Sequence, residues 1–134
     1  MPLISVVDDD IWVRQSLDSL IRSFGHQVRV FASAEEFLNS PPPQADCLIV
    51  DVRLPGMSGI ELHRRLLAGK CHVPVIFITA HASDERARSA AASDWTVGYL
   101  IKPFGEDELL AAVATALSRK PAPSQNTAKS RRSP

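Results

Sequence analysis

Four short stretches of the chain, at 3–7, 47–50, 75–78 and 97–101, are almost entirely apolar. Runs of this length without polar alternation are typical of strands that are buried on both faces, as in a parallel sheet covered by helices. The run at 47–50 is the most informative, because it ends directly on Asp51 and is followed by a segment rich in turn residues. We therefore place Asp51 at the carboxyl end of a central strand.

The segments between these runs carry apolar residues three and four positions apart, which predicts amphipathic helices. The first helix takes Asp10 as its N-cap and ends before Gly25, and Ser33 with Glu36 forms a capping box for the second. A weaker alternation at 27–31 predicts an edge strand. We expect helices at 11–24, 33–38, 58–67, 83–92 and 105–117. The core-facing candidates on the first and third helices are Val13, Leu17, Leu20, Ile21, Phe24, Ile60, Leu62, Leu66 and Leu67.

Strands and helices that alternate in this way predict an α/β domain with a doubly wound parallel sheet. The length of 134 residues and the hydrophobic share of 45% suit one domain with its own core. We assign residues 1–118 to the domain. Residues 119–134 are rich in Pro, Ser and basic side chains, and we expect them to form a disordered tail.

Positive and negative side chains balance at 15 each, but they are unevenly distributed. The tail at 119–134 holds five basic residues and no acidic one, so the body carries ten basic against 15 acidic residues. An acidic body disfavours a nucleic-acid-binding domain, and we expect no direct DNA binding. Cys47 and Cys71 fit free thiols in a reducing cytoplasm, and we expect neither a signal peptide nor a membrane span.

Polar residues stand where each apolar run ends: three aspartates at 8–10, Asp51, Thr79 and Lys102. The carboxyl ends of parallel strands meet at one edge of a sheet, where α/β proteins bind ligands, so these side chains should converge. Crowded carboxylates repel one another, and a hard divalent cation with oxygen ligands relieves that repulsion. Mg²⁺ suits one or two carboxylates and keeps waters, which leaves room for substrate oxygens. Taken singly, the aspartates also fit helix caps, Lys102 a strand-ending turn and Thr79 an ordinary strand residue.

The order and spacing of these motifs resemble the receiver domain of two-component response regulators, of the stand-alone, chemotaxis-regulator-like kind. The resemblance covers about residues 2–118. It implies a flavodoxin-like five-stranded sheet with strand order 2-1-3-4-5 and five helices. The motifs that carry it are the aspartates at 8–10, Asp51 with the turn segment 54–59, Thr79 with Ala80, and Lys102 with Pro103 and Phe104.

The resemblance implies that Asp51 is the phosphoacceptor, which attacks a phosphohistidine of a sensor histidine kinase or a histidine phosphotransfer protein. It implies Mg²⁺ as the cofactor, with Asp9 and Asp51 as direct ligands. Asp8 would hold a metal-bound water, and the backbone carbonyl of Arg53 would complete the set. Lys102 would join Mg²⁺ in offsetting charge on the transferring oxygens.

The family also implies a switch, in which Thr79 moves toward the phosphoryl group and Tyr99 moves inward. The face formed by the fourth helix, the last strand and the fifth helix would then meet a downstream protein or a second copy of the chain. Trp95 lies at the edge of this face, where an exposed aromatic can anchor a partner, although core packing is the alternative. His81 and Arg53 match positions that flank the site and tune dephosphorylation. We place all four histidines on the surface or in loops: His26, His63, His72 and His81.

One departure from the family pattern lies between Thr79 and Lys102, which are 23 positions apart, one more than usual. Residues 93–96, Ser-Asp-Trp-Thr, stand where a turn of small residues is typical. We therefore expect an unusual local backbone there, and an unusual output face with it.

Three other functions fit parts of the pattern. A haloacid-dehalogenase-like phosphatase also uses an aspartate nucleophile, but it needs a second aspartate two positions later, where this chain has Arg53. A nucleotide- or flavin-binding module would carry a glycine-rich phosphate loop, and neither G-x-x-x-x-G-K-[ST] nor G-x-G-x-x-G is present. A degenerate receiver would act only as a docking platform, yet the signature positions are intact.

Overall fold

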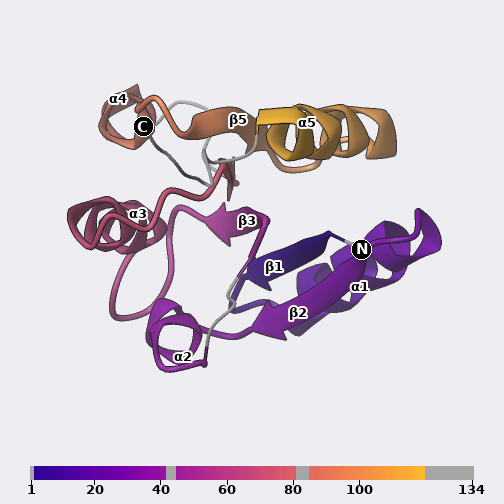
Figure 1. Ribbon diagram of the computed structural model, residues 1–134, viewed down its shortest axis with the longest axis horizontal. Helices are drawn as coiled ribbons and strands as arrows, with labels where there is room; N and C mark the ends of the chain where they lie inside the picture. Colours follow the sequence, from indigo (N-terminus) through magenta and orange to yellow (C-terminus); the bar gives the residue numbers. More distant parts are fainter. Residues whose placement is uncertain (1, 42–44, 81–84, 120–134) are drawn as a thin grey trace, which may run out of the picture.

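The computed structural model describes residues 2–41, 45–80 and 85–119. In this part of the chain, strands and helices alternate from end to end (Figure 1). The strands are β1 (Leu3–Val7), β2 (Gln27–Phe31), β3 (Cys47–Asp51), β4 (Val75–Thr79) and β5 (Thr96–Ile101). The helices are α1 (Ile11–Ser23), α2 (Ala34–Leu38), α3 (Gly59–Ala68), α4 (Glu85–Ala91) and α5 (Glu106–Arg119).

The strands form one sheet in the order β2-β1-β3-β4-β5, and all neighbours pair in parallel. Figure 1 shows α1 and α5 on one face of the sheet and α2, α3 and α4 on the other. The predicted flavodoxin-like, doubly wound fold with strand order 2-1-3-4-5 is therefore confirmed. Among the described residues, every helix is too short or too polar to cross a bilayer.

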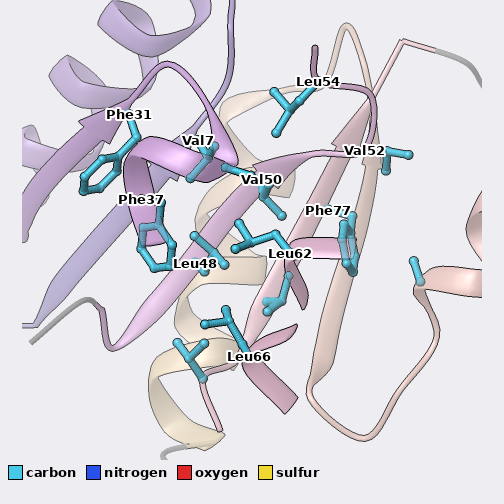
Figure 2. Packing of buried hydrophobic residues seen from close by; sticks show 14 residues of the cluster. Val7, Phe31, Phe37, Leu48, Val50, Val52, Leu54, Leu62, Leu66 and Phe77 are labelled. Carbon is cyan, nitrogen blue, oxygen red and sulfur yellow. The ribbon is translucent and has the colours of Figure 1, made fainter. Parts of the chain in front are cut away.

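Each central strand contributes to two cores, which explains why the apolar runs lack polar alternation. Burial of apolar surface, at about 25 cal/mol per Å², is the main favourable term in such a fold. Figure 2 shows Val50 near the centre of the core that faces α2, α3 and α4. That cluster includes Val7, Leu48, Val50, Val75 and Phe77 from the sheet and Phe37, Leu62, Leu66 and Ala91 from the helices. The cluster that faces α1 and α5 includes Ile4, Val6, Cys47, Ile49, Ile76 and Ile78 with Leu17, Ile21, Leu109 and Val113.

Polar caps fix the start of the helices that follow the strand ends. Asp10 Oδ1 accepts a hydrogen bond from the Trp12 N–H at 2.8 Å, as predicted, and Ser33 caps α2 in the same way. Ser58 Oγ accepts from the Glu61 N–H at 3.1 Å and starts α3. Because these caps satisfy N–H groups that lack partners within the helix, they also set where the preceding loops leave the sheet.

One of the predicted core positions is exposed. The prediction that Phe24 faces the core is wrong: Phe24 is the C-cap residue of α1 and is 55% exposed. Gly25, at a φ of 90°, turns the chain away directly after it. Val30 of the edge strand is likewise exposed, which leaves Val28 and Phe31 as its buried residues. On the helices, Leu17, Ile21, Leu62 and Leu66 are buried as predicted, whereas Val13, Leu20, Ile60 and Leu67 are only partly buried.

The predicted surface position of His63 is also wrong. Its side chain is 3% exposed on α3, and its ring packs edge-on against Phe77 with 5.6 Å between ring centres. Its Nε2 forms a hydrogen bond with Ser93 Oγ at 2.8 Å, which makes burial of a polar ring tolerable. Among the other histidines, His72 is exposed, His26 is partly buried and His81 lies outside the described residues.

The segment between Thr79 and Lys102 is one residue longer than is usual in the family, and the structure contains a β-bulge at the start of β5. Val75 pairs with Thr96 and Ile76 pairs with Gly98, so Val97 is additional on the β5 side. Beyond this point the two strands pair regularly up to their carboxyl ends. The unusual backbone is therefore confined to the amino end of β5, and the opposite edge of the sheet keeps its register.

Candidate functional site

Three aspartates come together at the carboxyl edge of the sheet. Asp51 is the last residue of β3, and Asp8 and Asp9 directly follow β1, the strand that pairs with β3. One carboxylate oxygen of each of the three lies within 4.8 Å of the others. Asp8 is fully buried, Asp51 is 7% exposed and Asp9 is exposed. The acidic cluster that the sequence predicts is thus formed, and its exposure increases from Asp8 to Asp9.

The ammonium group of Lys102 bridges the two buried carboxylates. Nζ donates to Asp51 Oδ2 at 2.8 Å and to Asp8 Oδ2 at 3.0 Å. The backbone N–H of Lys102 donates to the Thr79 carbonyl at 2.7 Å, which extends the pairing of β4 with β5 by one residue. The sheet itself therefore positions the lysine. The Lys102 ammonium thus offsets charge on the two buried carboxylates, and Asp9 adds a third carboxylate to the cluster.

Burial and pairing act on the ionisation of this cluster in opposite directions. Burial raises the pKa of Asp8 above 3.8, and the Asp51 charge raises it further, in spite of hydrogen bonds from Asp10 and Lys102. For Lys102, burial lowers the pKa, but the hydrogen bonds and charges of Asp51 and Asp8 together outweigh burial, so that its pKa is raised. Lys102 therefore stays an ammonium ion, while the Asp8 carboxylate is costly to keep ionised. An additional cation would relieve that cost.

Backbone groups and one arginine hold the two buried aspartates in place. Asp8 Oδ1 accepts from the Asp10 N–H at 2.8 Å, and Asp51 Oδ1 accepts from the Arg53 N–H at 2.9 Å. Arg14 of α1 donates from Nη1 to the backbone carbonyl of Asp8 at 2.7 Å. The sequence analysis missed Arg14, and the only signal was a basic residue one helical turn after the acidic run.

The loop from β3 to α3 approaches the site closely at Gly59. The Gly59 N–H donates to the Val52 carbonyl at 3.0 Å, and a Cβ on this residue would overlap the backbone carbonyl oxygen of Asp51. Only glycine fits such an approach. The start of α3 is therefore packed directly against the strand end that carries Asp51.

Thr79 and Tyr99 lie on neighbouring strands next to this edge. Thr79 is buried at the last position of β4, and Tyr99 is half-buried on β5, two residues before the partner of Thr79 in the strand register. The guanidinium carbon of Arg88 on α4 lies 5.1 Å from the centre of the Tyr99 ring. Tyr99 is thus in contact with α4, one of the three elements of the predicted output face.

Trp95 lies at the opposite end of β5 from Lys102. Its ring is half-buried and stacks on His72, with 5.2 Å between ring centres and 6° between the planes. The guanidinium carbon of Arg119 lies 4.5 Å from the same ring. Trp95 is therefore neither a fully exposed anchor nor part of the main cores, and it ties the end of α5 to the amino edge of the sheet.

The donor set of the acidic cluster fits a hard divalent cation. All three candidate ligands are carboxylate oxygens, which Mg²⁺ and Ca²⁺ prefer. A site with so few protein ligands suits Mg²⁺ better, because Mg²⁺ keeps several of its waters. The raised pKa of Asp8, caused mainly by burial and increased by the nearby Asp51 charge, is consistent with this, since a bound cation would favour the ionised carboxylates.

The fold and the site together define a class of α/β signalling module. Residues 4–114 match the family model of the response regulator receiver domain, and the chain belongs to that family. Receiver domains act in two-component signalling, where histidine kinases phosphorylate them, and Mg²⁺ dependence is a general feature of the family.

Named relatives agree with this assignment. Nodulation protein W from Bradyrhizobium diazoefficiens is 44% identical over 118 residues, which cover 87% of this chain and 52% of the relative. The structure of response regulator StyR is 42% identical with a TM-score of 0.77 and covers 89% of this chain and 60% of that one. The BeF3-activated DrrB receiver domain is 32% identical with a TM-score of 0.76 and covers 89% of this chain and 99% of that one. The chain spans about half the length of the curated relatives it matches.

Proposed function

We propose that Asp51 is the phosphoacceptor of this receiver domain. The observation that carries this proposal is the Lys102 ammonium, which lies 2.8 Å from Asp51 Oδ2 at the carboxyl edge of the sheet. Asp8 is fully buried, and Asp9 is exposed at the rim. Asp51 alone combines an exposed part of its surface with direct contact to the ammonium, so it is the carboxylate best placed to meet a phosphorus atom that arrives from solvent.

In the proposed transfer, a carboxylate oxygen of Asp51 attacks the phosphorus atom of a phosphohistidine. The phosphorus–nitrogen bond breaks, and its electron pair leaves with the imidazole of the donor. Lys102 then pairs with the phosphoryl oxygens, since its ammonium already contacts the attacking group. The buried hydroxyl of Thr79, on the strand next to β3, would bond the phosphoryl group once it is attached.

We assign the metal to the acidic cluster, with Asp9 and Asp51 as direct ligands and the backbone carbonyl of Arg53 as a third. Asp8 would act through a metal-bound water, since its carboxylate is fully buried, whereas Asp51 and Asp9 keep exposed surface. When bound, Mg²⁺ supplies positive charge next to the transferring oxygens. The BeF3-activated form of the related DrrB receiver domain supports a site of this kind, which accepts a phosphoryl-like group.

The donor in this proposal is a sensor histidine kinase or a histidine phosphotransfer protein in the cytoplasm. Thr79 and Tyr99 would pass the change to the face formed by α4, β5 and α5, with a downstream protein or a second copy of the chain as the recipient. The predicted domain is 1–118 with a tail at 119–134; α5 continues to Arg119, and 120–134 lie outside the described residues. Action as a stand-alone module, without direct DNA binding, stays a prediction, since the relatives are about twice as long.

The proposal is tested by incubating the chain with Mg²⁺ and acetyl phosphate and measuring its intact mass. One phosphoryl group should be added, and removal of Mg²⁺ should prevent the addition. Asp51→Asn should abolish the product, whereas Asp94→Asn, which changes an exposed aspartate away from the cluster, should not. A mass increase that survives Asp51→Asn would refute the assignment, and continuous release of inorganic phosphate at high turnover would favour a phosphatase instead.

A further inference from the structure

The short helix α2 reaches the loop between β3 and α3 through a single carboxylate. Glu35, on the exposed side of α2, accepts a hydrogen bond at Oε2 from the backbone N–H of Met57, 22 residues later, at 3.0 Å. The same hydrogen bond is the main reason why the pKa of Glu35 is lowered. Because the acceptor is a carboxylate and the donor belongs to the backbone, the contact fixes the loop itself rather than one of its side chains.

The carboxylate of Glu35 lies next to Gly56, the residue before Met57. Its φ is 76°, a conformation that other residues rarely adopt. A Cβ on Gly56 would lie 2.7 Å from Glu35 Oε2 and would displace the carboxylate. The turn in the loop therefore leaves room for the Glu35 carboxylate in its present position.

Further hydrogen bonds hold the loop at its two ends. At the β3 end, the Val52 N–H donates to the Ile78 carbonyl at 2.9 Å, and the Arg53 N–H donates to Asp51 Oδ1. At the α3 end, Ser58 caps the helix. Val52 and Leu54 also belong to the buried cluster seen in Figure 2. Between these two ends, the Met57 N–H in the turn at 55–57 donates to the Glu35 carboxylate.

The anchor is itself rigid. Ser33 caps α2, and Ala34 and Phe37 on either side of Glu35 are buried in the core. The Phe37 ring packs edge-on against Phe31 of β2 with 5.2 Å between ring centres. A displacement of the Glu35 backbone would therefore require α2 to leave the core, so the helix can act as a fixed support from which the side chain reaches the loop.

We propose that Glu35 is a positioning residue for the phosphorylation site, acting through the β3–α3 loop. It holds the turn at 55–57 so that the Arg53 amide stays on Asp51 and the Arg53 carbonyl stays available to the metal. Glu35 touches none of the reacting atoms. This inference rests on the proposed function, in which Asp51 receives the phosphoryl group and Arg53 contributes to the metal site.

The test compares Glu35→Ala, Glu35→Gln and Glu61→Ala with the parent chain. Glu61 is an exposed glutamate on α3 whose carboxylate pairs with Arg65 at 3.2 Å, so its removal deletes the same charge at a side chain that is bonded within α3. Amide hydrogen exchange is measured residue by residue in the metal-free protein, and Mg²⁺ affinity is measured by tryptophan fluorescence. Thermal unfolding of each variant gives the overall stability.

Glu35→Ala should accelerate exchange of the Met57 amide by about tenfold, as expected when a charge-assisted hydrogen bond is lost. The dissociation constant for Mg²⁺ should rise by about tenfold, the low end of the effect of losing a group that orients a metal ligand. Glu35→Gln keeps an acceptor oxygen, so its Met57 exchange rate and its dissociation constant for Mg²⁺ should stay close to those of the parent chain. Glu61→Ala should change neither.

Unchanged Met57 exchange in Glu35→Ala would overturn the inference. So would a uniform acceleration at all amides together with a lowered Tm, because that result describes general destabilisation. Normal Mg²⁺ affinity with fast Met57 exchange would also overturn it, since the loop would then be loose without any effect on the site. Phosphorylation of the parent chain is measured separately by intact mass. If the parent chain takes up no phosphoryl group, the proposed function is wrong. The exchange data still decide in that case whether Glu35 holds the loop.

Discussion

Asp8 and Lys102, 94 residues apart in the chain, form a 3.0 Å ion pair in which the carboxylate is fully buried. Lys102 divides its charge between this partner and Asp51. Removing carboxylates from water is costly, and a shared ammonium offsets only part of that cost. The buried charges of the site therefore lower the stability of the fold. Changes to Asp8, Lys102 or a bound cation should alter the balance between desolvation and charge pairing.

Replacement of Asp8 by asparagine should stabilise the fold. The folded pKa of Asp8 lies above 3.8, so the native state binds the proton first, and the free energy of unfolding decreases as pH rises through that window. Asp8→Asn removes the buried charge while Lys102 keeps Asp51 as its partner, so the variant should be more stable by about 1 kcal/mol at pH 7, the low end of the cost of burying a polar group. The gain should shrink as pH falls toward 4.

Urea unfolding at several pH values measures this effect. Asp9→Asn is the matched control, because Asp9 is exposed and belongs to the same cluster. If Asp8→Asn were no more stable than the parent at pH 7, burial would not be the dominant influence on Asp8.

Mg²⁺ should bind to the cluster and stabilise the fold. Binding to the native state alone adds about 2.7 kcal/mol to the free energy of unfolding when the metal is present at 100 times its dissociation constant. Asp9→Ala removes a proposed direct ligand and should weaken binding by tenfold or more, about the cost of losing one charged contact. Trp12, which is 74% exposed and follows the acidic run, should report the titration by fluorescence.

Trp12→Phe serves as the control for that measurement, since the signal should disappear while the Mg²⁺-dependent stabilisation remains. An Asp9→Ala variant with the same titration midpoint as the parent would exclude Asp9 from the ligand set.

Lys102→Ala should lower the free energy of unfolding by about 2 kcal/mol, because it leaves Asp8 and Asp51 without their shared cation. The loss should be smaller in the presence of Mg²⁺, which can replace part of the missing charge. We expect this variant to bind Mg²⁺ but to lose the conformational change caused by beryllofluoride. Circular dichroism and fluorescence follow both, and a normal beryllofluoride response would place Lys102 outside the phosphoryl site.

His63 should make stability depend on pH in the direction opposite to Asp8. Burial lowers the pKa of His63 below 6.5, so the unfolded chain binds the proton first as the solution becomes acidic. The free energy of unfolding should therefore fall as pH decreases from about 7 through 6.5 toward the folded pKa. His63→Gln should flatten this part of the curve, as measured by urea unfolding between pH 7.5 and 5.5. An unchanged slope would mean that His63 does not titrate in this window.

The fold was largely predictable because each signal was local. Unbroken apolar runs such as 47–50 indicate strands covered on both faces, and Asp10 and Ser33 mark helix starts through contacts within a few residues. The site followed from the fold, since parallel strands bring their carboxyl ends to one edge. Asp8, Asp51 and Lys102 could therefore be placed together without any knowledge of distances.

The missed features depend on contacts between distant segments. His63 is polar, yet it is buried because Ser93, on the far side of α4 in sequence, supplies a hydrogen bond. Glu35 resembles an ordinary acidic residue at a helix start until the turn at Met57 is seen beside it. Phe24 continued the apolar period of α1, but the helix ends one residue earlier. The extra residue before Lys102 was visible in the sequence, while its position in a bulge was not.

The bulge at Val97 lies on an edge strand of the sheet, since β5 has β4 on one side and no further strand in the described sheet on the other. A regular edge exposes a row of N–H and C=O groups to which another chain can add a strand, and such addition leads to aggregation. A bulge interrupts that row and increases the local twist. The additional residue thus makes the edge irregular at the amino end of β5 and disfavours addition of another strand there.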